Sequence, residues 1–233
     1  MSELIDTTEM YLRTIFELEE EGVVPMRARI TERLAQSGPT VSETVARMER
    51  DGLVVVSGDR HLELTVAGRE AATRVMRKHR IAECMLVEVI GMPWEDVHSE
   101  ACRWEHVMSD AVERRMLEIL GNPTVSPFGN PIPGLHDLRP EFDIADVEMG
   151  AVQPLSLIAS TELVGVTVRR FGETIQVDTD TMTRLRRVGA LPGALVQVRR
   201  SPGGISIGSA GEYTELADEL AMYVLVDAAA FGG

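Results

Sequence analysis

Side chains that bind transition metals gather in two stretches of this sequence. The later stretch offers two imidazoles, a thiol and a carboxylate: His98, Cys102, Glu105 and His106. On an ideal helix, where successive residues are about 100° apart, all four project from one arc of about 100°. In the earlier stretch, His79 and Glu83 are spaced to share a face one helical turn apart. A lone His or Cys is usually structural, but this clustering predicts a metal site.

The mixture of donor atoms narrows the choice of metal. Thiolate, imidazole and carboxylate together suit a divalent transition ion, whereas Ca²⁺ and Mg²⁺ prefer oxygen ligands alone. Fe²⁺, Co²⁺, Ni²⁺ and Zn²⁺ all remain chemically possible from these residues. The enzyme alternative is a catalytic metal site, which needs an open coordination position and a substrate cleft. The sequence adds no nucleophile elbow, phosphate loop or metallohydrolase motif, so we predict that the protein is not an enzyme.

A helix-turn-helix with a wing precedes most of these ligands. Apolar residues recur at helical spacing over residues 7–21, and residues 27–35 form a second, short helix. Residues 36–38 make a tight turn, Pro39 opens a third helix, and Gly52 ends it. Residues 53–65 contain turn residues between two short extended runs, which predicts a β-hairpin. Two short helices joined by a Gly-containing turn are typical of DNA-binding proteins.

The start of the third helix presents small and polar side chains, which permit close approach to bases in the major groove. Thr40 and Ser42 can bond bases or phosphates, and nearby arginines are placed to contact phosphate. We expect the DNA interface to comprise Thr7, Arg27, Ala28, Ser37, Pro39, Thr40, Ser42, Glu43, Arg47, Arg50 and Arg60. The alternative is a helical hairpin that contacts other proteins, with its arginines merely solvated.

The distribution of charge favours DNA, although the formal net charge of -14 at first argues against it. Residues 26–80 hold 11 basic and 7 acidic side chains, which leaves +4. Residues 81–233 hold 11 basic and 23 acidic side chains, which leaves -12. A basic lobe is therefore attached to an acidic body, and the basic lobe coincides with the predicted helix-turn-helix.

The rest of the sequence predicts a helical segment and a small β domain. Residues 66–90, 94–108 and 110–120 are amphipathic with surplus apolar surface, which suits a dimer interface that includes Trp104. Residues 121–154 are rich in Pro, Gly and Asn, and we expect a linker with local order. Six strand-like runs follow and indicate a small β barrel or sandwich: 155–160, 163–169, 174–178, 195–199, 204–207 and 221–226.

Length, cysteine content and apolar runs limit the number of domains and the cellular location that the sequence allows. A length of 233 residues allows two to three small domains. Two cysteines cannot make a disulfide framework and no charged, apolar leader opens the sequence, so we expect a reducing cytoplasm. No run of about 18 apolar residues occurs, so we expect no membrane span.

Six segments closely resemble the iron-dependent regulators of the diphtheria toxin repressor family. They are DTTEMYLRTI (6–15), SGPTVS (37–42), MERDGL (48–53), MRKHR (76–80), EACRWEHVM (100–108) and SPFGNPIPG (126–134). The likeness is continuous over residues 1–135 and patchy beyond. It implies an α+β protein with an N-terminal winged helix-turn-helix (1–73), a helical metal-binding and dimerisation domain (74–140), a linker (141–150) and a C-terminal SH3-like small β domain (151–233).

The resemblance also implies two metal ions per chain and the residues that hold them. The activating site would be Met10, Cys102, Glu105 and His106. The ancillary site would be His79, Glu83 and His98, joined by Glu173 and Gln176 of the SH3-like domain. An anion-binding group would be Arg80, Ser126 and Asn130. The four activating positions and His79, Glu83 and His98 carry residue types that match the family, and Glu173 and Gln176 have the matching spacing.

The function implied is an Fe²⁺-activated transcriptional repressor that binds operator double-stranded DNA as a homodimer and controls genes of iron uptake and iron homeostasis. Co²⁺, Ni²⁺, Mn²⁺ or Zn²⁺ could substitute for Fe²⁺. The alternative is a regulator of the same fold that responds mainly to manganese or zinc, and the soft ligands Cys102 and Met10 argue against manganese.

One position departs from the family. Where Gln is common, this chain has Glu43, which is acceptor-only and negatively charged. Facing a base, Glu43 should prefer the amino group of cytosine.

The mechanism that the resemblance implies begins at Met10, because a metal there ties the first helix to ligands far along the chain and rearranges the residues before Thr7. Coupling of about 1 to 3 kcal/mol is typical of such a switch.

Overall fold

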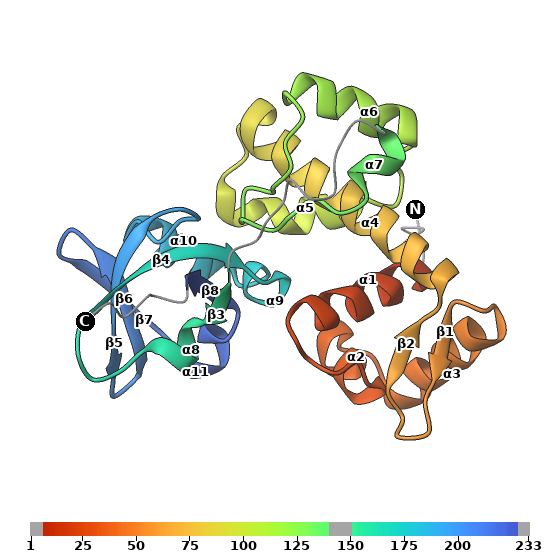
Figure 1. Cartoon of the computed structure of the whole chain (residues 1–233), viewed down its shortest axis with the longest axis horizontal. Coiled ribbons are helices and arrows are strands. Elements are labelled where there is room, and N and C mark those ends of the chain that lie inside the picture. The colour runs from red at the N-terminus through yellow and green to blue at the C-terminus, as the bar shows by residue number, and fades with distance from the viewer. Residues whose placement is uncertain (1–6, 140–150, 228–233) are drawn as a thin grey trace.

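The computed structural model describes residues 7–139 and 151–227. The predicted linker 141–150 and the residues before Thr7 lie outside the described residues. Figure 1 shows three lobes in chain order, and the long helix α4 (Val66–Met85) runs from the first lobe into the second. The predicted order of a winged helix, a helical domain and a small β domain is confirmed.

The first lobe is a winged helix. It contains α1 (Thr7–Glu20), α2 (Arg27–Leu34), α3 (Gly38–Arg50) and an antiparallel hairpin of β1 (Val54–Val56) and β2 (Leu62–Leu64). Its helices pack their apolar faces together, with Ile15, Ile30 and Val45 fully buried. Ser37 caps α3, because its hydroxyl accepts from the backbone N–H of Thr40 at 3.3 Å. The predicted bounds of these three helices agree with the structure to within two residues.

The wing lies very close to the start of α4. A Cβ on Gly68 would stand 1.9 Å from the backbone oxygen of Leu53, far inside van der Waals contact. Thr65 caps the same helix by accepting from the N–H of Gly68 at 3.0 Å. The hairpin and α4 are therefore fixed against each other by a backbone approach that only glycine permits.

The second lobe is helical. After α4 the chain continues through the π-helix η1 (Leu86–Ile90), the short 3₁₀ helix η2 (Trp94–Asp96), α5 (Val97–Trp104), α6 (Asp110–Ile119) and α7 (Leu135–Leu138). Arg77 is buried and donates to Glu113 at 2.8 Å and to Asp137 at 2.9 Å. Removing one partner of such a buried pair typically costs about 3–5 kcal/mol. The contact with Glu113 therefore holds α4 against α6, and the contact with Asp137 holds it against α7.

Several large apolar side chains of this lobe are exposed: Val89, Ile90, Val107, Val112 and Ile119. Trp104 is partly buried within the single chain, where its indole N–H donates to Glu100 at 2.9 Å.

No helix among the described residues is both long and apolar enough to cross a bilayer.

The third lobe is a six-stranded antiparallel sheet in the order β3-β8-β4-β5-β6-β7. Its strands are β3 (Val152–Pro154), β4 (Val164–Phe171), β5 (Leu195–Ser201), β6 (Gly204–Ser209), β7 (Glu212–Leu216) and β8 (Val224–Asp227). The helices between these strands are α8 (Leu155–Ile158), α9 (Glu173–Gln176), α10 (Thr179–Arg187) and α11 (Asp218–Ala221).

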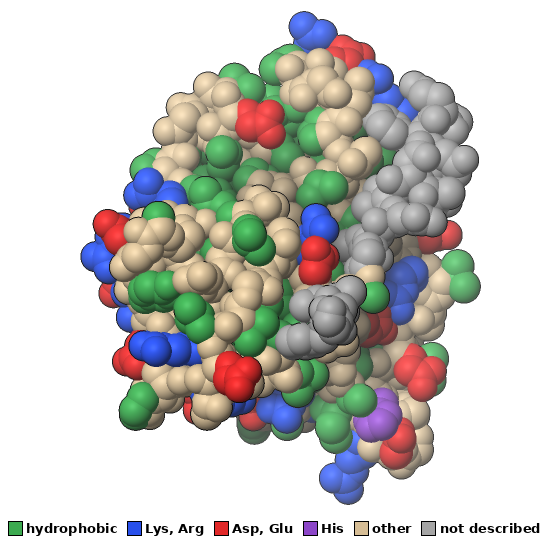
Figure 2. All heavy atoms as spheres, turned by 60° about the vertical axis from the view of Figure 1, so that its left-hand side comes forward, with side chains coloured by type: hydrophobic (Ala, Val, Ile, Leu, Met, Phe, Trp, Pro, Cys, Tyr) green, Lys and Arg blue, Asp and Glu red, His purple; other side chains and the backbone are tan. Residues whose placement is uncertain are grey.

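Figure 2 shows basic, acidic and apolar side chains interspersed on one face of the molecule, with no continuous basic patch there.

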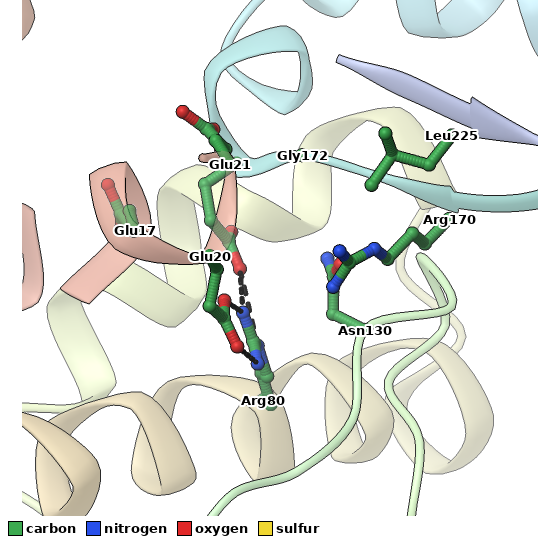
Figure 3. Close-up of a pocket in the computed structure, with 9 residues that line it drawn as sticks. Glu17, Glu20, Glu21, Arg80, Asn130, Arg170, Gly172 and Leu225 are labelled. Carbon is green, nitrogen blue, oxygen red and sulfur yellow. Dashed lines mark hydrogen bonds and ion pairs between the residues drawn. The ribbon is translucent and has the colours of Figure 1, made fainter. Parts of the chain in front are cut away.

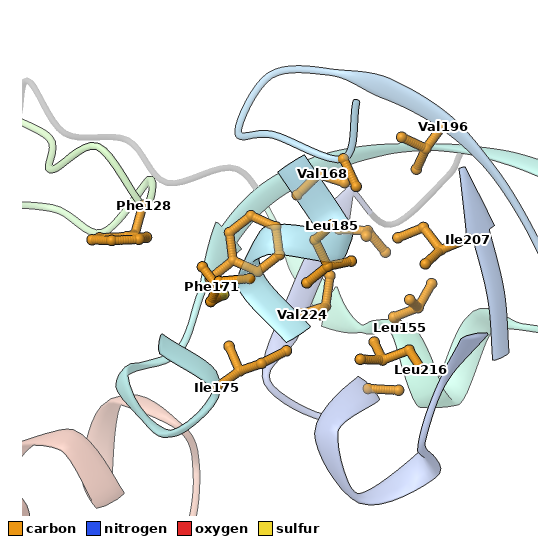
Figure 4. Close-up of a cluster of buried hydrophobic side chains, with 14 of the residues drawn as sticks. Phe128, Leu155, Val168, Phe171, Ile175, Leu185, Val196, Ile207, Leu216 and Val224 are labelled. Carbon is orange, nitrogen blue, oxygen red and sulfur yellow. The ribbon is translucent and has the colours of Figure 1, made fainter. Parts of the chain in front are cut away.

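One apolar cluster joins the second and third lobes. Phe128 enters it from the helical side and meets the buried residues of the sheet (Figure 4). The ring of Trp94 lies 4.9 Å from that of Phe128 and 5.5 Å from that of Phe171. The N–H of Phe171 donates to the carbonyl of Phe128 at 2.9 Å. The described part of the predicted linker 121–154 thus packs against the sheet.

Two strand predictions in this lobe are wrong. Residues 155–160 begin with helix α8 and residues 174–178 overlap helix α9. The sequence also did not predict β3, β7, α10 or α11. A helix of one turn is too short to establish a period of 3.6 residues, so its apolar composition resembles that of a strand.

Candidate metal centre

The ancillary ligands come from three helices in two lobes. His79 and Glu83 lie on α4, His98 lies on α5, and Glu173 and Gln176 lie on α9. One ligand atom from each of His79, Glu83, His98 and Glu173 lies within 4.8 Å of the others. His98 Nδ1 is 3.3 Å from Glu173 Oε2 and 3.1 Å from Gln176 Oε1. The structure therefore brings together all five side chains that the sequence assigned to this site, and all five are buried.

The chemistry of this group fits a divalent cation. Glu83 and Glu173 are buried at close quarters, which is costly without positive charge beside them. Oε2 of Glu83 is buried and accepts no hydrogen bond among the described residues. Imidazole nitrogen and carboxylate oxygen together are donors that a transition ion accepts.

The positive charge that balances Glu83 and Glu173 comes from protonation of the His79 and His98 imidazoles. Burial lowers the pKa of His79, but the charge of Glu83 and hydrogen bonds with Cys102, Glu105 and Glu173 together hold that pKa well above its usual value. Burial likewise lowers the pKa of His98, but the charge of Cys102 and hydrogen bonds from its neighbours raise it more. A metal ion bound by these nitrogens has to replace those protons.

The activating ligands follow on α5 and just beyond it. Cys102 lies on α5, and Glu105 and His106 come directly after its last residue. Nε2 of His106 is 3.3 Å from Glu105 Oε1, and its Nδ1 is 2.7 Å from Glu9 of α1. Burial raises the pKa of the Cys102 thiol, but the positive charges of Arg13 and His98 and hydrogen bonds with His79 and His98 together hold it well below its usual value. The thiolate, which is the form that ligates metals, is therefore stabilised.

Arg13 occupies the place beside these ligands that the sequence gave to Met10. Its Nη1 donates to Cys102 Sγ at 3.0 Å and to the two oxygens of Glu105 at 3.0 and 2.8 Å. Met10 instead packs against the core of the winged helix, and no described contact joins it to Cys102. Arg13 lies on α1 about one helical turn after Met10, and the role of Met10 as a ligand stays a prediction.

Arg13 and Glu9 contact the candidate ligands, and the sequence analysis did not single them out. Both lie on α1, on either side of Met10. Nε of Arg13 also contacts Glu17 at 2.7 Å. The spacing of Glu9, Arg13 and Glu17 on one helical face was the available signal.

His79 belongs to both ligand groups. Its Nε2 is 2.9 Å from Glu83 Oε1, and its Nδ1 is 2.6 Å from Glu105 Oε2. The two nitrogens of one buried ring thus face the ancillary and the activating carboxylates. This contact was not predicted, because it depends on how α4 packs against α5.

The residues of the expected anion-binding group have other partners in this structure. Arg80 is buried and pairs with both oxygens of Glu20, at 3.0 and 2.5 Å, and with Glu173 at 3.1 Å. Figure 3 shows Glu20 against Arg80, with Asn130 on the far side of the same cavity. This cavity of about 10 Å³ has room for about one water molecule. Ser126 accepts from the N–H of Phe128 at 3.2 Å and does not line the cavity.

Most of the expected DNA-contacting side chains are exposed. These are Ala28, Ser37, Pro39, Thr40, Ser42, Glu43, Arg47, Arg50 and Arg60, while Thr7 and Arg27 are partly buried. The exposed residues lie on α2, at the N-cap and on the exposed face of α3, and at the turn of the wing, so they are available to a DNA groove, while Thr7 begins α1.

A winged helix packed against buried histidine, thiolate and carboxylate ligands defines a class of metal-responsive DNA-binding proteins. Family models match nearly the whole chain. Residues 3–62 match the N-terminal DNA binding domain of iron dependent repressors, residues 65–134 their metal binding and dimerisation domain, and residues 157–228 the diphtheria toxin repressor SH3 domain. The chain belongs to the iron-dependent repressor family.

Curated relatives and solved structures agree with that assignment. The chain is 58% identical to the iron-dependent repressor IdeR of Mycobacterium leprae, over 97% of this chain and 99% of that protein. It is 50% identical to the diphtheria toxin repressor of Corynebacterium diphtheriae, over 97% and 99%. Its fold matches a manganese-dependent transcriptional repressor in complex with manganese, with a TM-score of 0.77 at 27% identity over 95% of this chain and 99% of that one.

Proposed function

We propose that this chain is an Fe²⁺-activated transcriptional repressor that binds operator double-stranded DNA as a homodimer and controls genes of iron uptake and homeostasis. The observation that carries the proposal is a buried ligand cluster contacted by α1 of the winged helix and built from both other lobes. Through that cluster a metal ion can bias the position of the DNA-binding elements. The site of action would be the cytoplasm, where the operator lies.

Two ions per chain are proposed. Cys102, Glu105 and His106 would hold the activating ion together with Met10, and His79, Glu83, His98, Glu173 and Gln176 would hold the ancillary ion. When bound, each ion supplies a divalent charge that its ligands share. Arg13 has to leave Glu105 for the activating set to assemble, because its guanidinium takes the same lone pairs. The anion-binding role of Arg80, Ser126 and Asn130 stays a prediction, since Arg80 here pairs with Glu20 and Glu173.

Iron is favoured over manganese by the ligands and by the relatives. A thiolate and a thioether suit a softer ion than Mn²⁺, and relatives 50% to 61% identical are named iron-dependent or diphtheria toxin repressors. Manganese stays the second candidate, because a solved neighbour of the same fold is a manganese-dependent repressor.

Operator binding under controlled metal tests the proposal. The full chain is titrated anaerobically against labelled operator DNA at fixed salt, with Fe²⁺, Mn²⁺ or chelator, because phosphate contacts make affinity strongly salt-dependent. We expect Fe²⁺ to raise affinity by about 5- to 150-fold and chelation to reverse the gain. Equal affinity with and without every divalent transition ion would refute the proposal, and activation by Mn²⁺ alone would favour the second candidate.

A homodimer is proposed from the exposed apolar surface of the helical lobe. Val107 is 81% exposed, and the other exposed apolar residues named above lie on the same lobe. A two-fold dimer would bury them and present two recognition helices to a palindromic operator. Sedimentation of the metal-loaded chain as a monomer at micromolar concentration would contradict this.

A further inference from the structure

We propose that Cys102, His79 and His98 form a metal site of their own, which takes a single thiophilic ion of the Zn²⁺ class and uses ligands drawn from both groups. One ligand atom from each of the three residues lies within 4.8 Å of the others. This inference rests on the proposed function, because it concerns how the same ligands are divided between ions.

The geometry of the three residues fits a tetrahedral ion. With a metal–sulfur distance of about 2.3 Å and a metal–nitrogen distance of about 2.0–2.1 Å, tetrahedral angles place sulfur and nitrogen about 3.6 Å apart. Cys102 Sγ and His98 Nε2 are 3.6 Å apart. The rings of His79 and His98 have their centroids 4.9 Å apart and are inclined at 65°. The Cys102–His98 distance therefore matches two ligands of one tetrahedral ion, and His79 offers a third ligand atom within 4.8 Å of both.

The second nitrogen of His98 supports this assignment. Nδ1 faces Gln176 at 3.1 Å and Glu173 at 3.3 Å. A ligating imidazole usually bonds a carboxylate or carbonyl through its other nitrogen, which fixes the orientation of the ring. With Nδ1 held in this way, Nε2 is the nitrogen presented to Cys102.

Arg13 contacts ligands of both sites, because its Nη1 donates to Cys102 Sγ at 3.0 Å as well as to Glu105. Its guanidinium takes both oxygens of Glu105, so an ion held by Cys102 and Glu105 has to displace it. An ion held by Cys102 and the two imidazoles needs neither Glu105 nor Met10. An ion at the mixed site therefore has to displace Arg13 from Cys102 Sγ but does not require the Glu105 oxygens.

Ligand sharing sets the stoichiometry. The mixed site uses the thiolate of one group and two imidazoles of the other, so a chain that fills it holds one ion where the proposed function has two. Zn²⁺ binds N and S ligands more tightly than Fe²⁺ does, and a site with three protein ligands suits it. Thiophilic ions should therefore enter here first.

Cobalt spectroscopy tests the mixed site, with Co²⁺ as the visible substitute for Zn²⁺. The metal-free full chain receives one equivalent of Co²⁺ anaerobically, and the sulfur-to-cobalt charge-transfer band is recorded and then chased with Zn²⁺. The variants are His98→Gln and Met10→Leu, with exposed His136→Gln as the matched control. We expect the band in the parent chain, in Met10→Leu and in His136→Gln, and an affinity at least about tenfold weaker in His98→Gln.

The outcomes separate this proposal from the proposed function. A band that survives His98→Gln but is lost in Met10→Leu would place Cys102 in the activating site and overturn the mixed site, as would the lack of a band at one equivalent. Fe²⁺-dependent operator binding by the parent chain is measured separately and can succeed in either case. If His98→Gln does not fold by circular dichroism, His79→Gln provides the same test.

Discussion

Replacing Arg13 by Gln should make the chain bind divalent metal more tightly while destabilising it without metal. The Arg13 side chain is 13% exposed and contacts Glu105 at 2.8 Å, Glu17 at 2.7 Å and Cys102 at 3.0 Å. It is therefore a built-in cation that neutralises the activating ligands. A metal ion at Cys102 and Glu105 has to compete with it.

The magnitude follows from the contacts that have to break. A hydrogen bond to a charged group contributes about 1.5–3 kcal/mol, which corresponds to about tenfold to about 150-fold in affinity. In the Arg13→Gln variant, a metal ion no longer has to break the hydrogen bond between Arg13 and Glu105. The affinity for metal should therefore rise by that factor. Without metal, buried Glu17 and Glu105 each lose one of their positive partners, and breaking a buried ion pair typically costs up to about 3–5 kcal/mol of unfolding free energy.

Two measurements check this prediction. Competition against a chromophoric chelator gives metal affinity, and thermal unfolding in excess chelator gives the stability of the metal-free chain. Arg29→Gln is the control, because Arg29 also pairs with a glutamate, Glu32 at 2.9 Å, but on the exposed surface. If Arg13→Gln binds metal with unchanged or weaker affinity, the guanidinium does not compete for the ligands and the reasoning is wrong.

Four further predictions address other parts of the chain. Cys102→Ala should reduce metal-dependent operator affinity more than His79→Ala in a metal titration at fixed salt, and the reverse order would mean that the two sites are assigned the wrong way round. Glu43→Gln should move base preference from cytosine toward adenine at one operator position by about 1–3 kcal/mol, measured on operator variants, and identical preferences would show that this side chain faces no base. Gly68→Ala should lower unfolding free energy by about 1–3 kcal/mol, because its Cβ would meet a backbone carbonyl at 1.9 Å, and an unchanged melting temperature would contradict the close approach. Val107→Asp should weaken the proposed dimer in sedimentation experiments, whereas an unchanged association constant would exclude this surface from the interface.

Local signals predicted the winged helix well. The apolar period of α1, the turn at Ser37 and the helix stop at Gly52 all depend on neighbours in sequence, and each lies where expected. The close approach of Gly68 to the wing is a contact between segments, and no local pattern announces it.

The SH3-like lobe shows where local signals fail. Residues 174–178 were predicted to be a strand, in which positions three apart face opposite sides of a sheet. In the helical turn of α9, Glu173 and Gln176 share a face, and both reach His98. The family resemblance placed these two residues at the metal centre, whereas periodicity alone would have separated them.

The difference between the two ligand groups locates the proposed switch. The four principal ancillary ligands already lie within 4.8 Å of one another, so filling that group requires little rearrangement of α4, α5 and α9. The activating group is different, because Arg13 lies against Glu105 while Met10 packs in the core of the winged helix. Only binding that differs between two states can shift their populations. We therefore expect metal to move the DNA-binding lobe through the activating group, whose completion would exchange Arg13 for Met10 on α1.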